Sequence, residues 1–446
     1  MRQLKPKPIN RESEFKENEM FFSCTDLKGI ILSGNDVFER VSKYSMEELI
    51  GSPHNIVRHP DMPKAVFKLL WDYIQSGRPI VAYVKNMAKD GSYYWVLATV
   101  MPVKDETGKI KEYISIRIKP TSPYFSIIPQ LYKNMLEAEK DGGIETSYKV
   151  LMDSLQVLNF ENYDEFMKDA LIAEIKNKTS LSQIEKSSTA RKHSKLILES
   201  SNLYNLIEKL FQSIMKLENL KNVFSKEAEE IYKMADEIRL TALNSSIESM
   251  HLGSSGAVFS VISAEMRKNS EEESKIVKQM RRLIDLNTKG IKEIMFTITL
   301  SKLEILMLLK FLSSLEEKGN DTNENLNNFY YLLSSSSEYF YKLSKLLINN
   351  FNTLEEIYKK IKTLKTLIEE LETMYFKGLI ESGYFDNTNF SIIYTGVKDL
   401  VTKNKRNILQ MEDSVANILE KRSSIIENIE ETRKELDRVK KLLNSS

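Results

Sequence analysis

The stretch Ser52–Trp71 reads SPHNIVRHPDMPKAVFKLLW and gathers the rarest residue types of the chain. It contains two of the four histidines, three of the ten prolines and one of the two tryptophans. Either these residues stiffen an irregular corner of the fold, or they surround a ligand. Composition alone favours the stiff corner, because isolated histidine and arginine side chains in loops usually lie at the surface.

Length and composition limit the class of protein. A chain of 446 residues exceeds one ordinary domain, so two or three domains are expected. The net charge of +1 implies no general attraction to nucleic acid or to an anionic membrane. The single cysteine, Cys24, excludes a disulfide framework and favours a reducing cytoplasm. The N-terminus lacks the apolar core of a signal peptide. The apolar run 294–312 carries Lys302, Glu304 and Lys310, which predicts a buried helix and no membrane span.

The chain has two parts of different character. All ten prolines and both tryptophans lie at or before Pro129, and residues 130–446 contain no proline. Because proline inside a helix costs about 3 kcal/mol, the second part is predicted to be all-α. The first part contains strand-like runs separated by turn sequences: MFFSCT, IILSGN, IVAYVKNMA, SYYWVLATVMPV and EYISIRIKP. They predict a small α+β domain with a five-stranded antiparallel sheet and short helices after the second strand.

The run NDVFERVSKYSMEELIGSPHNIVRHPDMPKAVFKLLW, with VKNMAKDGSYYWVLATVMPV and YISIRIKP after it, resembles the PAS domain of bacterial aerotaxis receptors. The resemblance covers residues 19–121 and implies a non-covalently bound FAD that reports redox state. Ile80 stands where that family carries a second tryptophan, which is a departure. The resemblance implies these cofactor-binding residues: Asn35, Arg58, His59, Asp61, Trp71 and Asn86.

The residue types agree in part with a flavin pocket. An isoalloxazine ring needs an apolar slot, an aromatic wall and a few amide or charged partners, and a pyrophosphate needs arginine or a helix N-terminus. Haem is the alternative cofactor, since His54 or His59 has an imidazole that can ligate iron. His193 and His251 stand alone, and no metal-ligand spacing, phosphate loop or G-x-S-x-G motif occurs. We therefore expect no enzymatic activity.

Residues 122–195 are predicted to be a helical connector broken near Asp141–Gly143, and residues 196–446 a helical bundle. Apolar residues recur at alternating steps of three and four over 343–375 and 411–443, as in coiled coils. The stretch 242–274 resembles the hairpin tip of methyl-accepting chemotaxis receptors, which implies docking of the chemotaxis histidine kinase and adaptor, or of other chemoreceptors. Asp236, His251 and Ser254 depart from that pattern, so the tip is degenerate. The predicted docking residues are Leu240, Asn244, Glu248 and Val261.

The tip motif occurs a second time. SSIESMHLGSSGAVFSVIS at 245–263 and KGLIESGYFDNTNFSIIYT at 377–395 share an I-E-S, a polar turn and F-S-[VI]-I. With tips near 253–256 and 384–389, the spacing predicts a long antiparallel four-helix coiled-coil bundle made by one chain, a pseudo-dimer. The alternative is a generic helical bundle in which the motif recurs by chance.

These observations predict an N-terminal extension (1–18), a PAS sensor (19–121), a connector (122–195) and a chemoreceptor-like bundle (196–446). The function expected is cytoplasmic redox or oxygen sensing for aerotaxis or energy taxis. Two alternatives remain open: an interaction module that associates with membrane chemoreceptors without controlling kinase, and a haem-based gas sensor.

Overall fold

The computed structural model describes residues 6–105, 107–178, 194–318, 323–385 and 389–445. The chain divides into two compact units. The first comprises Met1–Phe211, Met295–Lys342 and Asn428–Ser446, and the second comprises Gln212–Ile294 and Leu343–Glu427. Part of the predicted connector, part of the loop after α7 and the centre of the predicted second tip lie outside the described residues.

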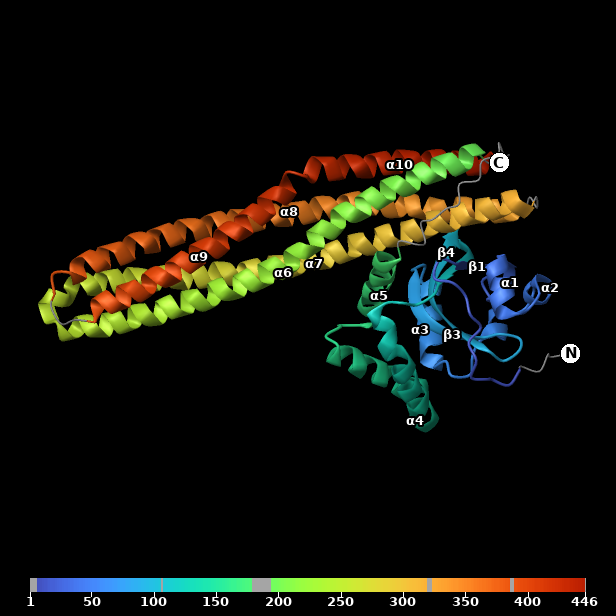
Figure 1. The fold of residues 1–446 in the computed structure, drawn as a ribbon, viewed down its shortest axis with the longest axis horizontal. Helices are drawn as coiled ribbons and strands as arrows, with labels where there is room; N and C mark the ends of the chain where they lie inside the picture. Colours follow the sequence, from blue (N-terminus) through green and yellow to red (C-terminus); the bar gives the residue numbers. More distant parts are fainter. Residues whose placement is uncertain (1–5, 106, 179–193, 319–322, 386–388, 446) are drawn as a thin grey trace. The chain divides into compact units, whose positions relative to one another are not determined.

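The N-terminal domain, drawn in blue in Figure 1, is built on a five-stranded sheet. The spatial order of the strands is β2-β1-β5-β4-β3. The strands are β1 (Met20–Thr25), β2 (Ile31–Gly34), β3 (Ile80–Met87), β4 (Tyr93–Lys104) and β5 (Ile110–Ile118). Every neighbouring pair is antiparallel. Between β2 and β3 run α1 (Asp36–Ser42), α2 (Met46–Leu49), the 3-10 turn η1 (His54–Val57) and α3 (Lys64–Gln75). The predicted five-stranded sheet with short helices is confirmed.

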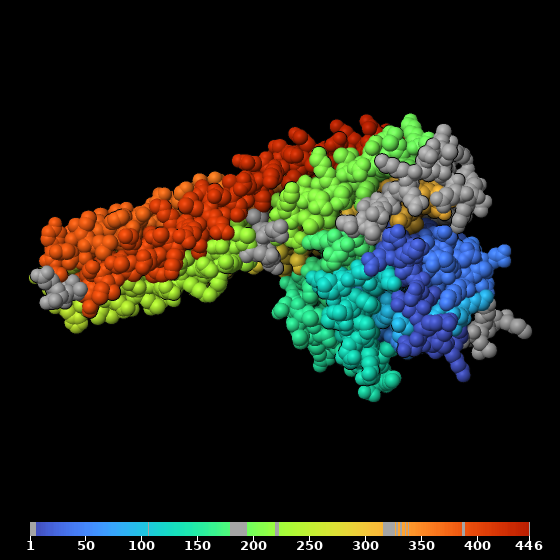
Figure 2. All heavy atoms as spheres, viewed as in Figure 1, coloured from blue at the N-terminus to red at the C-terminus, as the bar shows by residue number. Residues whose placement is uncertain are grey.

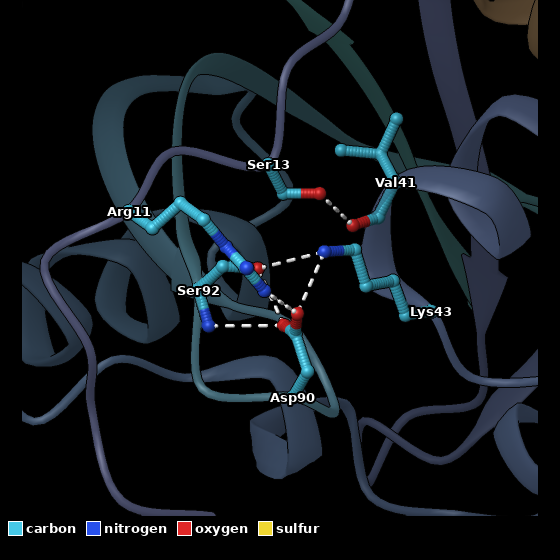
Figure 3. A network of polar contacts seen from close by, with 6 residues as sticks. All are labelled: Arg11, Ser13, Val41, Lys43, Asp90 and Ser92. Carbon is cyan, nitrogen blue, oxygen red and sulfur yellow. Dashed lines mark hydrogen bonds and ion pairs between the residues drawn. The ribbon is translucent and has the colours of Figure 1, made fainter.

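The segment before β1 packs onto the turn between β3 and β4 (Figure 3). Arg11 and Lys43 both pair with the carboxylate of Asp90, at 2.5 and 2.8 Å. The Ser13 hydroxyl donates to the carbonyl of Val41 at 2.8 Å, and the Ser92 backbone N–H donates to Asp90 at 3.0 Å. Burial raises the pKa of Asp90, but the hydrogen bonds from Lys43, Ser92 and Arg11 outweigh it and leave that pKa well below its usual range.

The chain that follows β5 packs first on the sheet face opposite to α3. The turn η2 (Pro123–Ile127) leads from β5 into α4 (Ile128–Val157), and α5 (Tyr163–Asn177) follows. Gly143, with φ 75°, interrupts α4 at the predicted break. Trp95 of β4 packs edge-on against Phe125 at 5.3 Å, and the Tyr132 hydroxyl donates to the carbonyl of Tyr83 at 2.8 Å. Figure 2 shows the atoms of α4 and α5 lying directly against those of the sheet domain.

A buried carboxyl group fixes α5 to the end of the sheet. Glu174 is 0% exposed and accepts hydrogen bonds from the backbone N–H groups of Thr121 and Ser122, both at 2.8 Å. The Thr121 hydroxyl donates to it at 2.8 Å, and the Tyr83 hydroxyl of β3 donates at 3.5 Å. Because a buried carboxyl group is costly without partners, this cluster determines where α5 docks.

Long helices make up the rest of the chain, as predicted. They are α6 (Ser194–His251), α7 (Ala257–Lys318), α8 (Asn323–Ser382), α9 (Phe390–Leu419) and α10 (Arg422–Asn444). A four-helix bundle with its second tip near 384–389 predicts one continuous helix after that tip, but the chain there forms two helices, with a break between Leu419 and Arg422. Arg422 occupies an apolar position of the repeat, where its guanidinium pairs with Glu355 and lies 5.7 Å from the ring centre of Phe351. Residues 294–312 are largely buried within α7, and no helix of the described residues is long and apolar enough to cross a membrane.

Both hairpins of the second unit contribute to one aromatic layer. Phe259 of α7 stacks on Phe390 of α9 at 3.8 Å, and both side chains are 0% exposed. The Tyr394 hydroxyl bonds with Ser245 of α6 at 3.2 Å. A Cβ at Gly378 of α8 would lie 2.4 Å from the Tyr394 ring, so only glycine permits this approach. All four helices of this unit therefore meet within one chain.

Replacing Glu174 tests the docking of α5. In Glu174→Ala, the amides of Thr121 and Ser122 should exchange hydrogen at least about tenfold faster, because each bond to a charged group contributes about 1.5–3 kcal/mol. Hydrogen exchange of the full chain by mass spectrometry measures this. The control is Glu137→Ala in α4, where the side chain is exposed. Unchanged exchange at Thr121 and Ser122 would contradict the anchoring role.

Candidate functional site

A cavity lies between the sheet and the helical segment η1–α3 of the N-terminal domain. Its volume is about 230 Å³, and about 1020 Å³ with the open space at its mouth. Dry cavities of about 150 Å³ already hold benzene, so this one has room for a larger aromatic ring. The residues that line it come from every strand except β2 and from the intervening segments: Ser23, Thr25, Lys28, Gly29, Pro53, His54, Asn55, Arg58, Phe67, Leu70, Trp71, Ile74, Val84, Asn86, Ala98, Val100, Tyr113, Ser115 and Arg117.

The apolar wall of the cavity belongs to α3. Phe67, Leu70, Trp71 and Ile74 share one face of that helix because they are three or four residues apart. The Trp71 ring meets Tyr113 of β5 edge-on, with centroids 6.0 Å apart. The first turn of α3 is capped from outside the sheet domain, since the Ala65 backbone N–H donates to the Glu139 carboxylate of α4 at 3.0 Å.

The buried end of the cavity carries an arginine. Arg117 of β5 is 4% exposed and donates to the Ser23 hydroxyl at 3.0 Å and to Nε2 of His54 at 2.7 Å. Desolvation of the His54 imidazole, assisted by the Arg117 charge, lowers the pKa of His54 to about 3. Burial lowers the pKa of Arg117 to about 10, so the guanidinium keeps its charge at pH 7.

Arg58 stands on the half-buried side of the cavity. Its guanidinium lies 4.0 Å from the ring centre of Phe67 and donates to the carbonyl of Met62 at 3.0 Å. Burial lowers the pKa of Arg58, and Glu139 opposes this shift. A backbone bridge joins Arg58 to Asn86 of β3, which is 4% exposed. Of the six residues predicted to bind a cofactor, Arg58, Trp71 and Asn86 line this cavity.

The other predicted cofactor residues do not line this cavity. Asn35 caps α1 by accepting from the Phe38 backbone N–H at 3.2 Å. Nδ1 of His59 accepts from the Asp61 backbone N–H at 3.1 Å, and Asp61 pairs with Lys85 at 2.6 Å. Burial, then the Lys85 charge, lowers the pKa of His59 to about 4 against the opposing effect of Asp61. These contacts shape the loop that presents Arg58.

Sequence reasoning missed Arg117, Ser23, Tyr113 and Ser115, and it considered His54 only as a haem ligand. A signal was present in YISIRIKP, where a charged residue interrupts an apolar strand. Tyr113, Ser115 and Arg117 alternate along β5, so their side chains share one face. A cation on the buried face of a strand is the unusual feature of that pattern.

The predicted docking residues lie in the second unit, near the turn η4 (Gly253–Gly256) that joins α6 to α7. Gly253 has φ +57°, and a Cβ at Gly256 would lie 2.0 Å from the Ser249 carbonyl oxygen, so both positions require glycine. Leu240 and Val261 are 46% and 58% exposed, Asn244 is exposed and Glu248 is half-buried. Other apolar side chains are exposed nearby: Leu243, Ile247, Met250 and Val258.

Among the described residues, no cluster of His, Cys, Asp and Glu side chains has the geometry of a metal site. The structure does provide a cavity with apolar and polar lining residues in one unit and an exposed apolar turn region in the other.

Comparison with known proteins agrees with the fold. The PAS fold family matches residues 31–117, and the chain contains a PAS domain. The aerotaxis receptor of Escherichia coli is 41% identical over 128 residues, which are 29% of this chain and 25% of that protein. The chain thus spans about a quarter of the length of that relative. The biofilm dispersion protein BdlA of Pseudomonas aeruginosa is 22% identical over 272 residues, covering 60% of this chain and 56% of that protein.

Solved PAS-type structures are also similar. The light-state structure of the blue-light photoreceptor Aureochrome1 LOV is 24% identical with a TM-score of 0.23, and it covers 25% of this chain and 90% of that one. The PAS domain from Colwellia psychrerythraea is 23% identical with a TM-score of 0.20, covering 22% and 85%.

His54 makes the stability of the PAS domain depend on pH. The folded-state pKa of His54 is about 3, below the unfolded value of about 6.5. Between these two pH values the imidazole is protonated in the unfolded chain and neutral in the folded chain. The stabilisation is complete above pH 6.5 and is lost as the pH falls toward 3, by up to about 1.4 kcal/mol per pH unit.

Urea unfolding followed by tryptophan fluorescence measures this loss, because Trp71 and Trp95 both belong to the PAS domain. His54→Gln should show a shallower loss of unfolding free energy between pH 6.5 and 5 than the wild type. His59 is present in both proteins and contributes equally. The matched control is His251→Gln, in the second unit, which should keep the wild-type slope; equal slopes for all three proteins would contradict the assignment.

Proposed function

We propose that the chain is a cytoplasmic PAS-type redox or oxygen sensor for aerotaxis or energy taxis that binds FAD and is not an enzyme. The observation that carries the proposal is the cavity with the Trp71 and Phe67 wall beside the Arg58 guanidinium, in a domain similar to the aerotaxis receptor over this region. An aromatic slot with a few polar groups is the environment that an isoalloxazine ring requires.

The chain's own residues have distinct roles in this proposal. Trp71 and Tyr113 would contact the flavin ring, Asn86 would hydrogen-bond its polar edge, and Arg58 at the half-buried side would hold the pyrophosphate. When bound, the flavin supplies the electron acceptor. Phe67, Leu70 and Ile74 keep water away from the ring.

Haem is less well supported. Nε2 of His54 is occupied by the Arg117 guanidinium at 2.7 Å, and His59 does not line the cavity. An iron ligand would require His54 to give up that contact.

In this proposal, the connector (122–195) and the second unit transmit the signal from the PAS domain to partner proteins. Glu139 and Glu174 attach α4 and α5 to α3 and to the end of β5, so a ligand that changes the packing of α3 changes the environment of the connector. The region around Leu240, Asn244, Glu248 and Val261 would contact the chemotaxis kinase and adaptor or other chemoreceptors. The aromatic layer at Phe259 and Phe390 supports a single-chain pseudo-dimer.

A second function is favoured by the exposed apolar residues near η4 together with the departures His251 and Ser254. The second unit would then bind other chemoreceptors without controlling kinase activity.

Replacing Trp71 tests the cofactor proposal. The purified wild type should carry flavin, seen as absorption bands near about 370 and 450 nm. Trp71→Ala should bind FAD about tenfold more weakly in a titration, because it removes the aromatic wall. Trp95→Phe, on the opposite sheet face, is the matched control and should bind normally. A single intense Soret band, or no uptake of FAD by the wild type, would contradict the proposal.

Replacing Val261 tests the output proposal. With purified histidine kinase and adaptor, the wild-type chain should bind and change kinase autophosphorylation. Val261→Asp should weaken binding at least about tenfold, because it places a charge in an apolar contact. Leu286→Asp is the control, since Leu286 is a similarly exposed apolar residue of α7 (64% against 58%). Binding without a change in kinase activity would favour the second function, and no binding at all would contradict docking.

A further inference from the structure

Arg117 is a buried cation that has no counter-ion among the residues the structure describes. Its two hydrogen bonds go to neutral groups, the Ser23 hydroxyl and the His54 imidazole. In the part of the chain that the structure describes, no carboxylate forms an ion pair with it. The Phe38 ring, 5.6 Å from the guanidinium carbon, gives only a weak cation–π contact.

This arrangement is costly unless something else supplies the negative charge. Removing a guanidinium from water costs several kcal/mol even in a relaxed protein interior, and an ordinary buried arginine recovers this from a bidentate carboxylate. His54 cannot contribute negative charge. Since Arg117 donates to its Nε2, the neutral ring carries its proton on Nδ1.

The other charged residues that line the cavity are also positive. The charged residues that line it are Lys28, Arg58 and Arg117, and none of its described lining residues is Asp or Glu. Lys28 is exposed, Arg58 is half-buried and Arg117 is buried, so positive charge is present at both the open and the buried side. A cavity of this kind selects for a ligand with negative groups at two separate places.

A second polar group at the buried end also has no partner in the protein. Ser115 lines the cavity two residues before Arg117 on the same face of β5, and its buried hydroxyl makes no hydrogen bond within the described structure. Buried hydroxyls are nearly always hydrogen-bonded, so this one indicates a ligand atom or water at the same place.

We propose that Arg117 and Ser115 form an anion-accepting subsite that binds the negatively charged edge of a planar aromatic ligand, while Arg58 and Lys28 remain for a second anionic group nearer the mouth. Ser23 and His54 act as positioning residues that hold the guanidinium. For a flavin, which rests on the function proposed above, the group at Arg117 would be the carbonyl-bearing edge of the ring, and the phosphates would lie at Arg58. The oxygens of that edge carry partial negative charge in the oxidised ring, and the ring carries a full negative charge once it is reduced and deprotonated.

Aromatic probes test the subsite without any flavin. The full-length protein is titrated with 2-naphthoate, which is ionised at pH 7, and with the neutral 2-naphthamide, while Trp71 fluorescence reports entry into the cavity. The naphthoate should bind at least tenfold more tightly than the amide to the wild type and to Arg117→Lys. Arg117→Gln should lose this preference while keeping its affinity for the amide. Equal affinities of the wild type for the two probes would overturn the proposal, even if a variant failed to fold.

Flavin fragments then identify the ligand group at Arg117. Riboflavin presents the ring without phosphate, and ADP presents the phosphates without the ring. Arg117→Gln should weaken riboflavin at least tenfold and leave ADP unchanged, whereas the reverse pattern would overturn the assigned orientation. If the wild type binds neither FAD nor riboflavin, the proposed flavin function is wrong. The preference for naphthoate over naphthamide then still tests whether the anion-accepting subsite exists. If flavin binds but the charge preference is absent, the subsite fails and the flavin function stands.

Discussion

Consecutive residues of β3, β4 and β5 point to opposite faces of one sheet, and this alternation lets the PAS domain carry a cavity and a connector at once. On β3, Val84 and Asn86 line the cavity. Tyr83, the residue before Val84, points to the other face, where its hydroxyl bonds with Ser122 and Glu174. On β4, Ala98 and Val100 face the cavity, and Trp95 packs on Phe125 and Tyr132. The two faces are thus one residue apart along the backbone, and a shift of register by one residue would exchange them.

The second unit depends on a different constraint, the close approach of α8 to α9. An aromatic layer at Phe259, Phe390 and Tyr394 fills the space between the hairpins, and Gly378 leaves room for the Tyr394 ring. Buried polar residues lie farther along the same helices, where Asn404 donates to Glu273 and Asn287 donates to the Asn350 carbonyl at 3.0 Å. Burial, opposed by the Asn404 bond, raises the pKa of Glu273 to about 8. Such polar positions fix the register of helices that apolar packing alone leaves ambiguous.

Much of this organisation follows from sequence pattern, because proline distribution and apolar periodicity act through local geometry. The strands, the break near Gly143 and the long helices were predicted in this way. Arg58, Trp71 and Asn86, three of the six residues that the resemblance implied for cofactor binding, line the cavity, whereas Asn35, His59 and Asp61 serve caps and loops beside it. Arg117 could not be assigned from pattern alone. Its importance comes from the absence of a paired carboxylate among the described residues, and that depends on which strands and turns meet in three dimensions. The break between α9 and α10 was missed for a related reason, since Arg422 is held by Glu355 on another helix.

The N-terminus of α3 is the point at which cavity and connector meet. This helix begins after Pro63, which offers no side-chain cap, so its first turn depends on the Glu139 carboxylate of α4. Glu139 also opposes the lowered pKa of Arg58, the guanidinium that rests on Phe67 one turn into the same helix. A negative ligand group beside Arg58 would therefore compete electrostatically with Glu139 for the same cation. The free energy available for a change in α4 is limited to the difference that the ligand makes to this shared interaction, and so it cannot exceed the few kcal/mol that a half-buried charge contact supplies.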